Sequence, residues 1–293
     1  MLTNARFDLS RLRSLSRFLG SGDRQPADPA SAARVVCVAS GKGGVGKSVL
    51  ATNLAVARAS RGERVLLLDF DAGLANLHLL LGLAPTHDLG HVLDGTVAAR
   101  DAIVAGPSGM HLLSGGVGRH TLANPTRREL DRLFQALRPL ERDYDLLVVD
   151  HGAGIAYSTI AHLAAASTLL LVTSHEVTAL SDAYALYKRA KSVNEHLRVG
   201  LVLNRAPDEA AADAAWERFK GVALKFLGDS PEYVGWIPQD DAVPRSVQAR
   251  VPVTLGEPKS RASAAFVRIA AWPPIDHART PTSFYERARR ALA

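Results

Sequence analysis

The chain has 293 residues and a formal net charge of +6, which is long enough to bury the core of one large α/β domain or of two small domains. A mean hydropathy of +0.02, the lack of any run approaching about 18 uncharged apolar residues and the lack of a secretory signal pattern lead us to expect a cytoplasmic protein. The single cysteine, Cys37, excludes an internal disulfide bond and argues against a cysteine-based metal or iron–sulfur site.

The positive charge lies mainly at the two ends of the chain. Residues 1–34 carry six arginines against three aspartates, and residues 273–293 carry four arginines against two acidic residues. The nearly neutral body between them argues against binding to nucleic acid. We expect three parts: a basic leader and linker (1–33), an α/β domain (34–272), and a proline-rich hinge followed by a short helix (273–293). The first 20 residues fit either a basic helix or a disordered arm.

The first strand-like run, Val35–Ala39, leads into a glycine-rich segment, and a helix-forming stretch follows. A strand, a glycine loop and a helix start come in this order in phosphate-binding loops. The glycines let backbone N–H groups turn toward phosphates, and the helix N-terminus adds partial positive charge. Lys47 would contact the outer phosphates and Ser48 would hold Mg²⁺. The predicted nucleotide-binding residues of this loop are Gly41, Gly43, Gly44, Val45, Gly46, Lys47 and Ser48.

Further along the chain, apolar strand-like runs alternate with helical stretches. The strand-like runs are Val65–Leu68, Met110–Leu113, Leu146–Val149, Thr168–Val172, Val199–Leu203 and Tyr233–Ile237. The helical stretches are 126–138, 155–166, 177–196, 209–227 and 259–271. This alternation predicts a mostly parallel, doubly wound sheet that binds its ligand at the carboxyl ends of the strands.

One of these strands ends in an acidic residue that bears on metal binding. Val148 and Val149 precede Asp150, and four apolar residues followed by an aspartate match a Walker B pattern. Asp150 would therefore lie beside Mg²⁺ or its water ligands. Gly152 and Gly154 follow, and they would let the next loop change its backbone conformation when a phosphate leaves.

The second lysine of the loop, Lys42, makes the segment Lys42–Ser48 resemble the deviant P-loop of the MinD/ParA ATPases. In that family this lysine reaches across a nucleotide-sandwiched dimer, so the resemblance implies a homodimer that forms on ATP. The segment Asp69–Leu77 resembles the MinD switch I. There the second aspartate, here Asp71, orients the attacking water, and the first, Asp69, lies near the outer shell of the metal.

A later segment favours one branch of that family. Val172–Tyr184 ends in Asp-Ala-Tyr and resembles the FlhG/FleN (YlxH) proteins, which set flagellar number and placement. Segments 103–109, 114–116 and 203–205 agree with this branch. By the same resemblance, the base of the nucleotide would meet Asn204, Arg205, Pro238 and Asp240. His151 and His175 depart from the family pattern, and their roles stay open.

Residues 282–293 predict a short basic amphipathic helix. Phe284, Tyr285 and Leu292 fall on one arc, and Arg287 lies beside them. Three large apolar side chains at about 2 kcal/mol each would hold one copy weakly on a membrane, and two copies on a dimer would bind more strongly. We predict a membrane contact here. A solvated tail, or a helix packed on its own domain, is the alternative.

These features together predict an Mg²⁺-ATP-dependent switch ATPase of the FlhG/FleN type with slow turnover, which associates reversibly with the inner face of the cell membrane. The resemblance implies as partners an FlhF-type GTPase, flagellar switch-complex proteins or a flagellar transcriptional activator. The leader keeps Asp8 and Leu12-Arg13 of the segment that stimulates FlhF but lacks its Gln-Ala. The alternatives are a MinD-like division-site ATPase, a ParA-like DNA-partition ATPase and a scaffold that binds nucleotide without hydrolysing it.

Overall fold

The computed structural model describes residues 33–71, 75–116, 125–274 and 282–292. The predicted basic leader over 1–32 and most of the predicted hinge, residues 275–281, lie outside these ranges.

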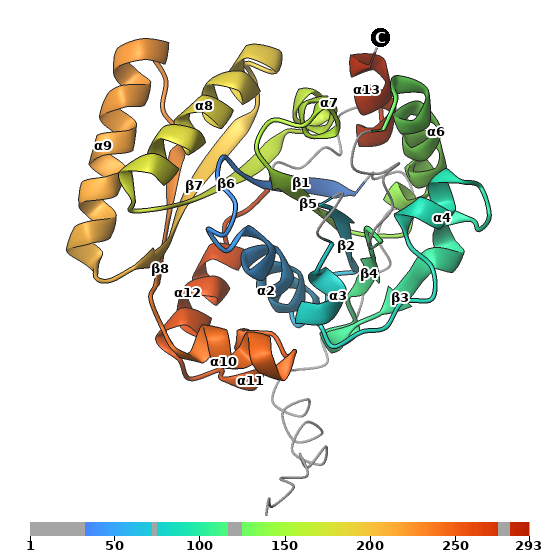
Figure 1. The fold of residues 1–293 in the computed structure, drawn as a ribbon, viewed down its shortest axis with the longest axis horizontal. Coiled ribbons are helices and arrows are strands. Elements are labelled where there is room, and N and C mark those ends of the chain that lie inside the picture. The colour runs from blue at the N-terminus through green and yellow to red at the C-terminus, as the bar shows by residue number, and fades with distance from the viewer. Residues whose placement is uncertain (1–32, 72–74, 117–124, 275–281, 293) are drawn as a thin grey trace, which may run out of the picture.

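An eight-stranded sheet forms the centre of the molecule (Figure 1), with the spatial order β3-β4-β2-β5-β1-β6-β7-β8. The strands are β1 (Arg34–Ser40), β2 (Val65–Phe70), β3 (Ile103–Ala105), β4 (His111–Leu113), β5 (Leu146–Ala153), β6 (Thr168–Ser174), β7 (Arg198–Ala206) and β8 (Glu232–Pro238). Every neighbouring pair is parallel except β3 and β4. The prediction of a mostly parallel sheet is confirmed, and the antiparallel edge strand β3 was not predicted as a strand.

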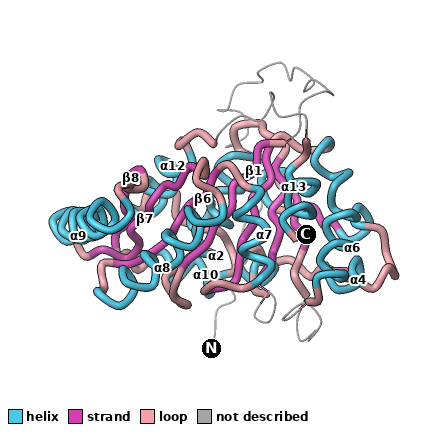
Figure 2. Tube along the Cα trace, turned by 90° about the horizontal axis from the view of Figure 1, so that it is seen from above, coloured by secondary structure: helices cyan, strands magenta, loops and turns pink. Residues whose placement is uncertain are grey.

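Helices cover both faces of the sheet (Figures 1 and 2). One layer contains α2 (Lys47–Ala59), α3 (Leu77–Leu80), α10 (Ala242–Ala249), α11 (Val253–Gly256) and α12 (Arg261–Ala270). The other contains α4 (Leu89–Leu93), α6 (Arg127–Leu137), α7 (Tyr157–Ala165), α8 (Val177–Val193), α9 (Glu209–Leu227) and α13 (Phe284–Ala291). Three short 3₁₀ turns complete the described elements, at Ala99–Ala102, Pro107–Gly109 and Arg138–Arg142.

The alternation of side chains along the central strand builds two apolar layers. Cys37 of β1 packs with the layer that includes α6 and α13, whereas Val36 and Val38 pack with the layer that includes α2. A parallel sheet covered on both faces requires this, because both sides of each strand are buried. Cys37 is fully buried, and burial raises the pKa of its thiol. It is a core residue and not a reactive nucleophile.

The C-terminal helix α13 differs from its expected position. Its predicted membrane-contacting side chains Phe284, Tyr285 and Leu292 are at most 4% exposed, because they pack on α6 and α7. The fourth, Arg287, donates a hydrogen bond to the carbonyl oxygen of Ala165 over 3.0 Å. In this conformation the helix packs on its own domain, which was the alternative, and the membrane contact stays a prediction. The apolar core of the described domain includes this helix.

A buried carboxylate fixes the start of α13. Glu141 accepts the backbone N–H groups of Phe284 and Tyr285 over 2.9 and 2.8 Å. These N–H groups have no partner within the helix. Glu141 therefore satisfies two donors that would otherwise be buried without a hydrogen-bond partner. In both views α13 lies beside α6 and α7 (Figures 1 and 2). Among the described helices, none has both the length and the apolar character of a membrane span.

Candidate nucleotide-binding site

The glycine-rich loop links the end of β1 to the start of α2, at the carboxyl edge of the sheet. Gly44 and Gly46 adopt φ angles of 76° and 88°, in the left-handed region that favours glycine. A Cβ atom on Gly41 would lie 2.1 Å from the carbonyl oxygen of Asp182. The loop therefore needs glycine at these positions, and α2 begins directly after it at Lys47. This is the strand-loop-helix arrangement that the sequence predicted.

Lys47 lies among acidic side chains at the base of the loop. Its Nζ atom is 2.9 Å from Asp150 Oδ1 and 3.8 Å from Asp71 Oδ2, and it donates to Ser48 Oγ over 3.1 Å. Lys47 is 6% exposed and Asp150 is fully buried. Burial raises the pKa of Asp150, whereas the charge of Lys47 opposes that rise. The structure thus brings together four of the residues that the sequence assigned to the phosphates, the metal and the water.

The same cluster offers oxygen ligands to a cation. The second carboxylate oxygen of Asp150, Oδ2, is buried and has no hydrogen-bond partner, and the Ser48 hydroxyl is close by. Mg²⁺ prefers hard oxygen ligands and needs only one or two from the protein when phosphates supply others. Within the described ranges no group of three or more His, Cys, Asp or Glu side chains gathers to hold a metal. Asp150 and Ser48 therefore fit an Mg²⁺ ion that is bound together with phosphates.

Asp69 lies at the end of β2 and holds the segment that follows it. One carboxylate oxygen accepts the N–H group of Asp71 over 3.1 Å, and the other accepts that of Leu77 over 3.3 Å. Burial, aided by the charge of Asp150, raises the pKa of Asp69 to about 7. Asp69 therefore holds the backbone on both sides of residues 72–74, which lie outside the described ranges. One of these two contacts positions Asp71, whose carboxylate lies near Lys47.

Lys42 points away from the Lys47 cluster. Its Nζ atom is 2.9 Å from Glu176 Oε2 and donates to Thr178 Oγ1 over 3.1 Å, and its side chain is 39% exposed. Large apolar side chains are also exposed on the segments next to it, namely Ile155 (49%), Tyr157 (48%) and Val177 (65%). The outer lysine of the loop thus sits on an open surface that is partly apolar.

The four predicted base-binding residues make different contacts in the structure. Asn204 is 5% exposed and donates from Nδ2 to the Val45 carbonyl oxygen over 2.7 Å, while its Oδ1 atom accepts the N–H group of Arg205. It therefore touches the glycine loop. The carboxylate of Asp240 instead accepts backbone N–H groups at the starts of α10 and α12. Pro238 ends β8 and is buried.

His162 was not singled out from the sequence. Its ring is buried against Phe70, Phe134 and Phe284, and its centroid lies 4.9 Å from that of His151. None of the four nitrogens of the two histidine rings has a hydrogen-bond partner. Burial lowers the pKa of His162 to about 3 and lowers that of His151 well below its usual range. A lone histidine in an apolar helical stretch carries no sequence signal for such a pair.

A glycine loop at a helix N-terminus, a buried lysine and converging carboxylates at the edge of a parallel sheet define a P-loop nucleotide-binding protein. The chain belongs to the CobQ/CobB/MinD/ParA nucleotide binding domain family, whose model matches residues 36–253. The resemblance drawn from the segment Lys42–Ser48 is therefore confirmed.

Individual proteins of known name are similar to most of this chain. The antiactivator FleN of Pseudomonas aeruginosa is 36% identical over 244 residues, which cover 82% of this chain and 87% of FleN. The flagellum site-determining protein YlxH of Helicobacter pylori is 31% identical over 219 residues, 74% of each chain. Among solved structures, the septum site-determining protein MinD of Pyrococcus horikoshii complexed with Mg-ADP superposes with a TM-score of 0.67 at 27% identity and covers 81% of this chain and 94% of that one.

Proposed function

We propose that this chain is an Mg²⁺-ATP-dependent switch ATPase that regulates flagellar number and placement. Its relatives include an antiactivator, FleN, and a flagellum site-determining protein, YlxH, which support the proposal. One observation carries the proposal. The two lysines of the loop point to different places, Lys47 inward to Asp150 and Lys42 outward to Glu176. An inner lysine suits phosphates bound by the same chain, and an outer lysine suits those bound by a second chain.

Within one chain the proposed chemistry follows from the cluster. The glycine loop and Lys47 would bind the phosphates of ATP, and Ser48 and Asp150 would hold Mg²⁺, which neutralises charge on the phosphates when it is bound. Asp71 Oδ2 lies 3.8 Å from Lys47 Nζ, and Asp71 would orient the attacking water. Asp69 would act by positioning Asp71 through its backbone N–H group. Asn204 and Arg205 would lie toward the base, because Asn204 already contacts the loop.

Between chains, we expect the surface around Lys42 to be covered by a second copy when ATP is bound. The exposed side chains Ile155, Tyr157 and Val177 would be buried there, and burying apolar surface favours association. Lys42 would leave Glu176 for the phosphates of the partner. An exposed ion pair of this kind contributes little to stability, so its loss would oppose the exchange only weakly.

The proposed membrane contact requires α13 to leave the body of the protein. Its apolar side chains are buried against α6 and α7, so they cannot meet lipid in the described conformation. We expect the ATP-bound dimer to release the helix and to reach the inner face of the cell membrane through two copies of it. An FlhF-type GTPase, a flagellar switch-complex protein or a flagellar transcriptional activator would then distinguish the two states.

The molar mass of the purified protein by light scattering tests this function. We expect a monomer with ADP, a dimer with ATP, and a longer-lived dimer with ATP for Asp71→Ala, which should bind ATP without hydrolysing it. Asp213→Ala, an exposed acidic residue of α9, serves as the matched control and should behave like the unmodified chain. A mass that does not respond to nucleotide would overturn the proposed switch.

A further inference from the structure

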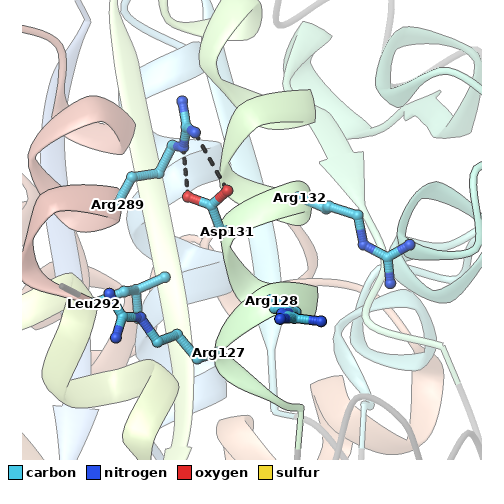
Figure 3. Close-up of a pocket in the computed structure, with 6 residues that line it drawn as sticks. All are labelled: Arg127, Arg128, Asp131, Arg132, Arg289 and Leu292. Carbon is cyan, nitrogen blue, oxygen red and sulfur yellow. Dashed lines mark hydrogen bonds and ion pairs between the residues drawn. The ribbon is translucent and has the colours of Figure 1, made fainter.

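A second hollow lies away from the nucleotide site, between the first turns of α6 and the end of α13 (Figure 3). Its volume is about 840 Å³, which is within the range of pockets that bind small ligands or the side chains of a peptide. The residues that line it are Arg127, Arg128, Asp131, Arg132, Arg289 and Leu292. Four guanidinium groups thus surround one carboxylate.

That carboxylate neutralises only one of the four. Asp131 accepts two hydrogen bonds from Arg289, over 2.8 and 3.2 Å. Arg127, Arg128 and Arg132 are exposed and form no hydrogen bond or ion pair within the described ranges. The nearby Glu129 accepts hydrogen bonds from the backbone and hydroxyl of Thr126, at the start of α6. Asp131 attracts Arg127 and Glu129 attracts Arg132, but neither attraction is an ion pair, so the hollow keeps an excess of positive charge.

These charges are placed where they disfavour the helix that carries them. Arg127 and Arg128 occupy the first turn of α6, where the positive end of the helix dipole repels cations. Arg128 and Arg132 are four residues apart, a spacing at which like charges repel across one turn. Neither arrangement stabilises the fold. A ligand that supplies negative charge would relieve both.

We propose that this hollow binds an acidic segment of a partner protein, with carboxylates received by Arg127, Arg128 and Arg132. Guanidinium groups bind carboxylates through paired hydrogen bonds. In Figure 3, Arg127 extends toward Leu292, whereas Arg132 extends away from it, so the three groups suit carboxylates spaced along a chain better than one compact anion. Leu292 offers an apolar contact, and none of the described residues that line the hollow has an aromatic ring to stack a nucleotide base.

Fluorescence anisotropy with the full-length protein in ADP tests this proposal without relying on dimerisation or lipid. The probe is a short fluorescein-labelled peptide of glutamate and leucine residues, and a twin peptide carries glutamine in place of every glutamate. We expect the glutamate peptide to bind and the glutamine twin not to bind. The triple variant Arg127→Ala/Arg128→Ala/Arg132→Ala should weaken binding about tenfold or more, since hydrogen bonds between charged groups are the strong ones.

A matched control removes the same charge from another surface. Arg218→Ala/Lys220→Ala/Lys225→Ala changes three basic residues of α9 and should leave the affinity within about twofold, because these residues do not line the hollow. Equal weakening by both triple variants would overturn the proposal in favour of non-specific attraction. A second result would also overturn it. In that result, the triple variant of Arg127, Arg128 and Arg132 loses binding to inorganic phosphate or to phosphatidylglycerol vesicles but keeps its affinity for the glutamate peptide.

The single variant Arg132→Lys guards against an effect on folding. It keeps the charge and changes only the planar donor group. We expect an unchanged unfolding temperature and a peptide affinity between those of the unmodified chain and the triple variant. An affinity equal to that of the unmodified chain would overturn the assignment of Arg132 to paired hydrogen bonds with a carboxylate.

Discussion

The buried ring of His162 shows how one residue can make stability depend on pH. It is enclosed by Phe70, Phe134 and Phe284, and the titratable groups that face it are His151 and Tyr285. Burial lowers its pKa to about 3 in the folded protein, whereas an unfolded histidine has a pKa of about 6.5. As the pH falls below that value, the unfolded chain gains a proton that the folded chain excludes. This residue therefore costs stability toward acid pH.

We predict that His162→Leu flattens the pH dependence of unfolding. Between about pH 7.5 and about pH 5 the unmodified chain should lose about 2 kcal/mol more than the variant, because only the unmodified chain carries this histidine. Denaturant titrations at both pH values measure the difference, which separates His162 from the carboxylates that titrate in both proteins. His196→Leu, on an exposed histidine, is the control. An identical pH slope for the unmodified chain and His162→Leu would refute the prediction.

At the scale of single residues, the sequence predicted those whose role depends on a local pattern. Lys47, Ser48 and Asp150 belong to motifs of fixed spacing, and the structure brings them together. Asp240 and Glu141 were different, because each binds backbone N–H groups far along the chain. Such contacts depend on how the elements pack, and no local pattern encodes them.

At the scale of elements, the long periodic segments were predicted well. The helix expected over 209–227 has those bounds in the structure, and the expected strands lie within the observed ones or extend them by one residue. The short elements α3, α4, α10, α11 and β3 were not predicted, because segments of three to eight residues show too little periodicity. The helix α13 was predicted as a helix, but its partner was not. An amphipathic pattern predicts that one face of a helix is buried, but it does not predict which surface covers that face.

The ion pair between Arg289 of α13 and Asp131 of α6 gives a way to loosen that helix. We predict that Asp131→Ala raises binding to anionic liposomes about two- to fivefold in ADP, because a partly exposed ion pair contributes up to about 1 kcal/mol to docking. Liposome sedimentation measures it. Asp143→Ala is the control: it removes a similar ion pair, the one with Arg100, and changes the net charge of the protein by the same amount at a place away from α13. Equal binding by the two variants would mean that charge alone acts and that α13 stays docked.

At the scale of the whole molecule, a change at Lys42 would separate nucleotide binding from the proposed association. We predict that Lys42→Ala binds ATP with an affinity within about threefold of the unmodified chain and remains a monomer with ATP, because Lys42 lies outside the Lys47 cluster in its own chain. Light scattering and titration of a fluorescent ATP analogue measure the two properties. Lys220→Ala, on α9, is the control and should still dimerise. Dimer formation by Lys42→Ala would assign association to other contacts.

For the proposed membrane contact, the docked position of α13 would make the protein body compete with the lipid for the same helix face. The helix face that holds Phe284, Tyr285 and Leu292 can touch α6 and α7 or a bilayer, but not both. The apparent lipid affinity would then be the intrinsic affinity multiplied by the fraction of molecules in which the helix is free. Residues that never touch lipid, such as Glu141 and Phe134, would thereby set the lipid concentration at which half the molecules bind. Two chains with identical terminal helices could respond to very different membranes if the surfaces beneath those helices differ.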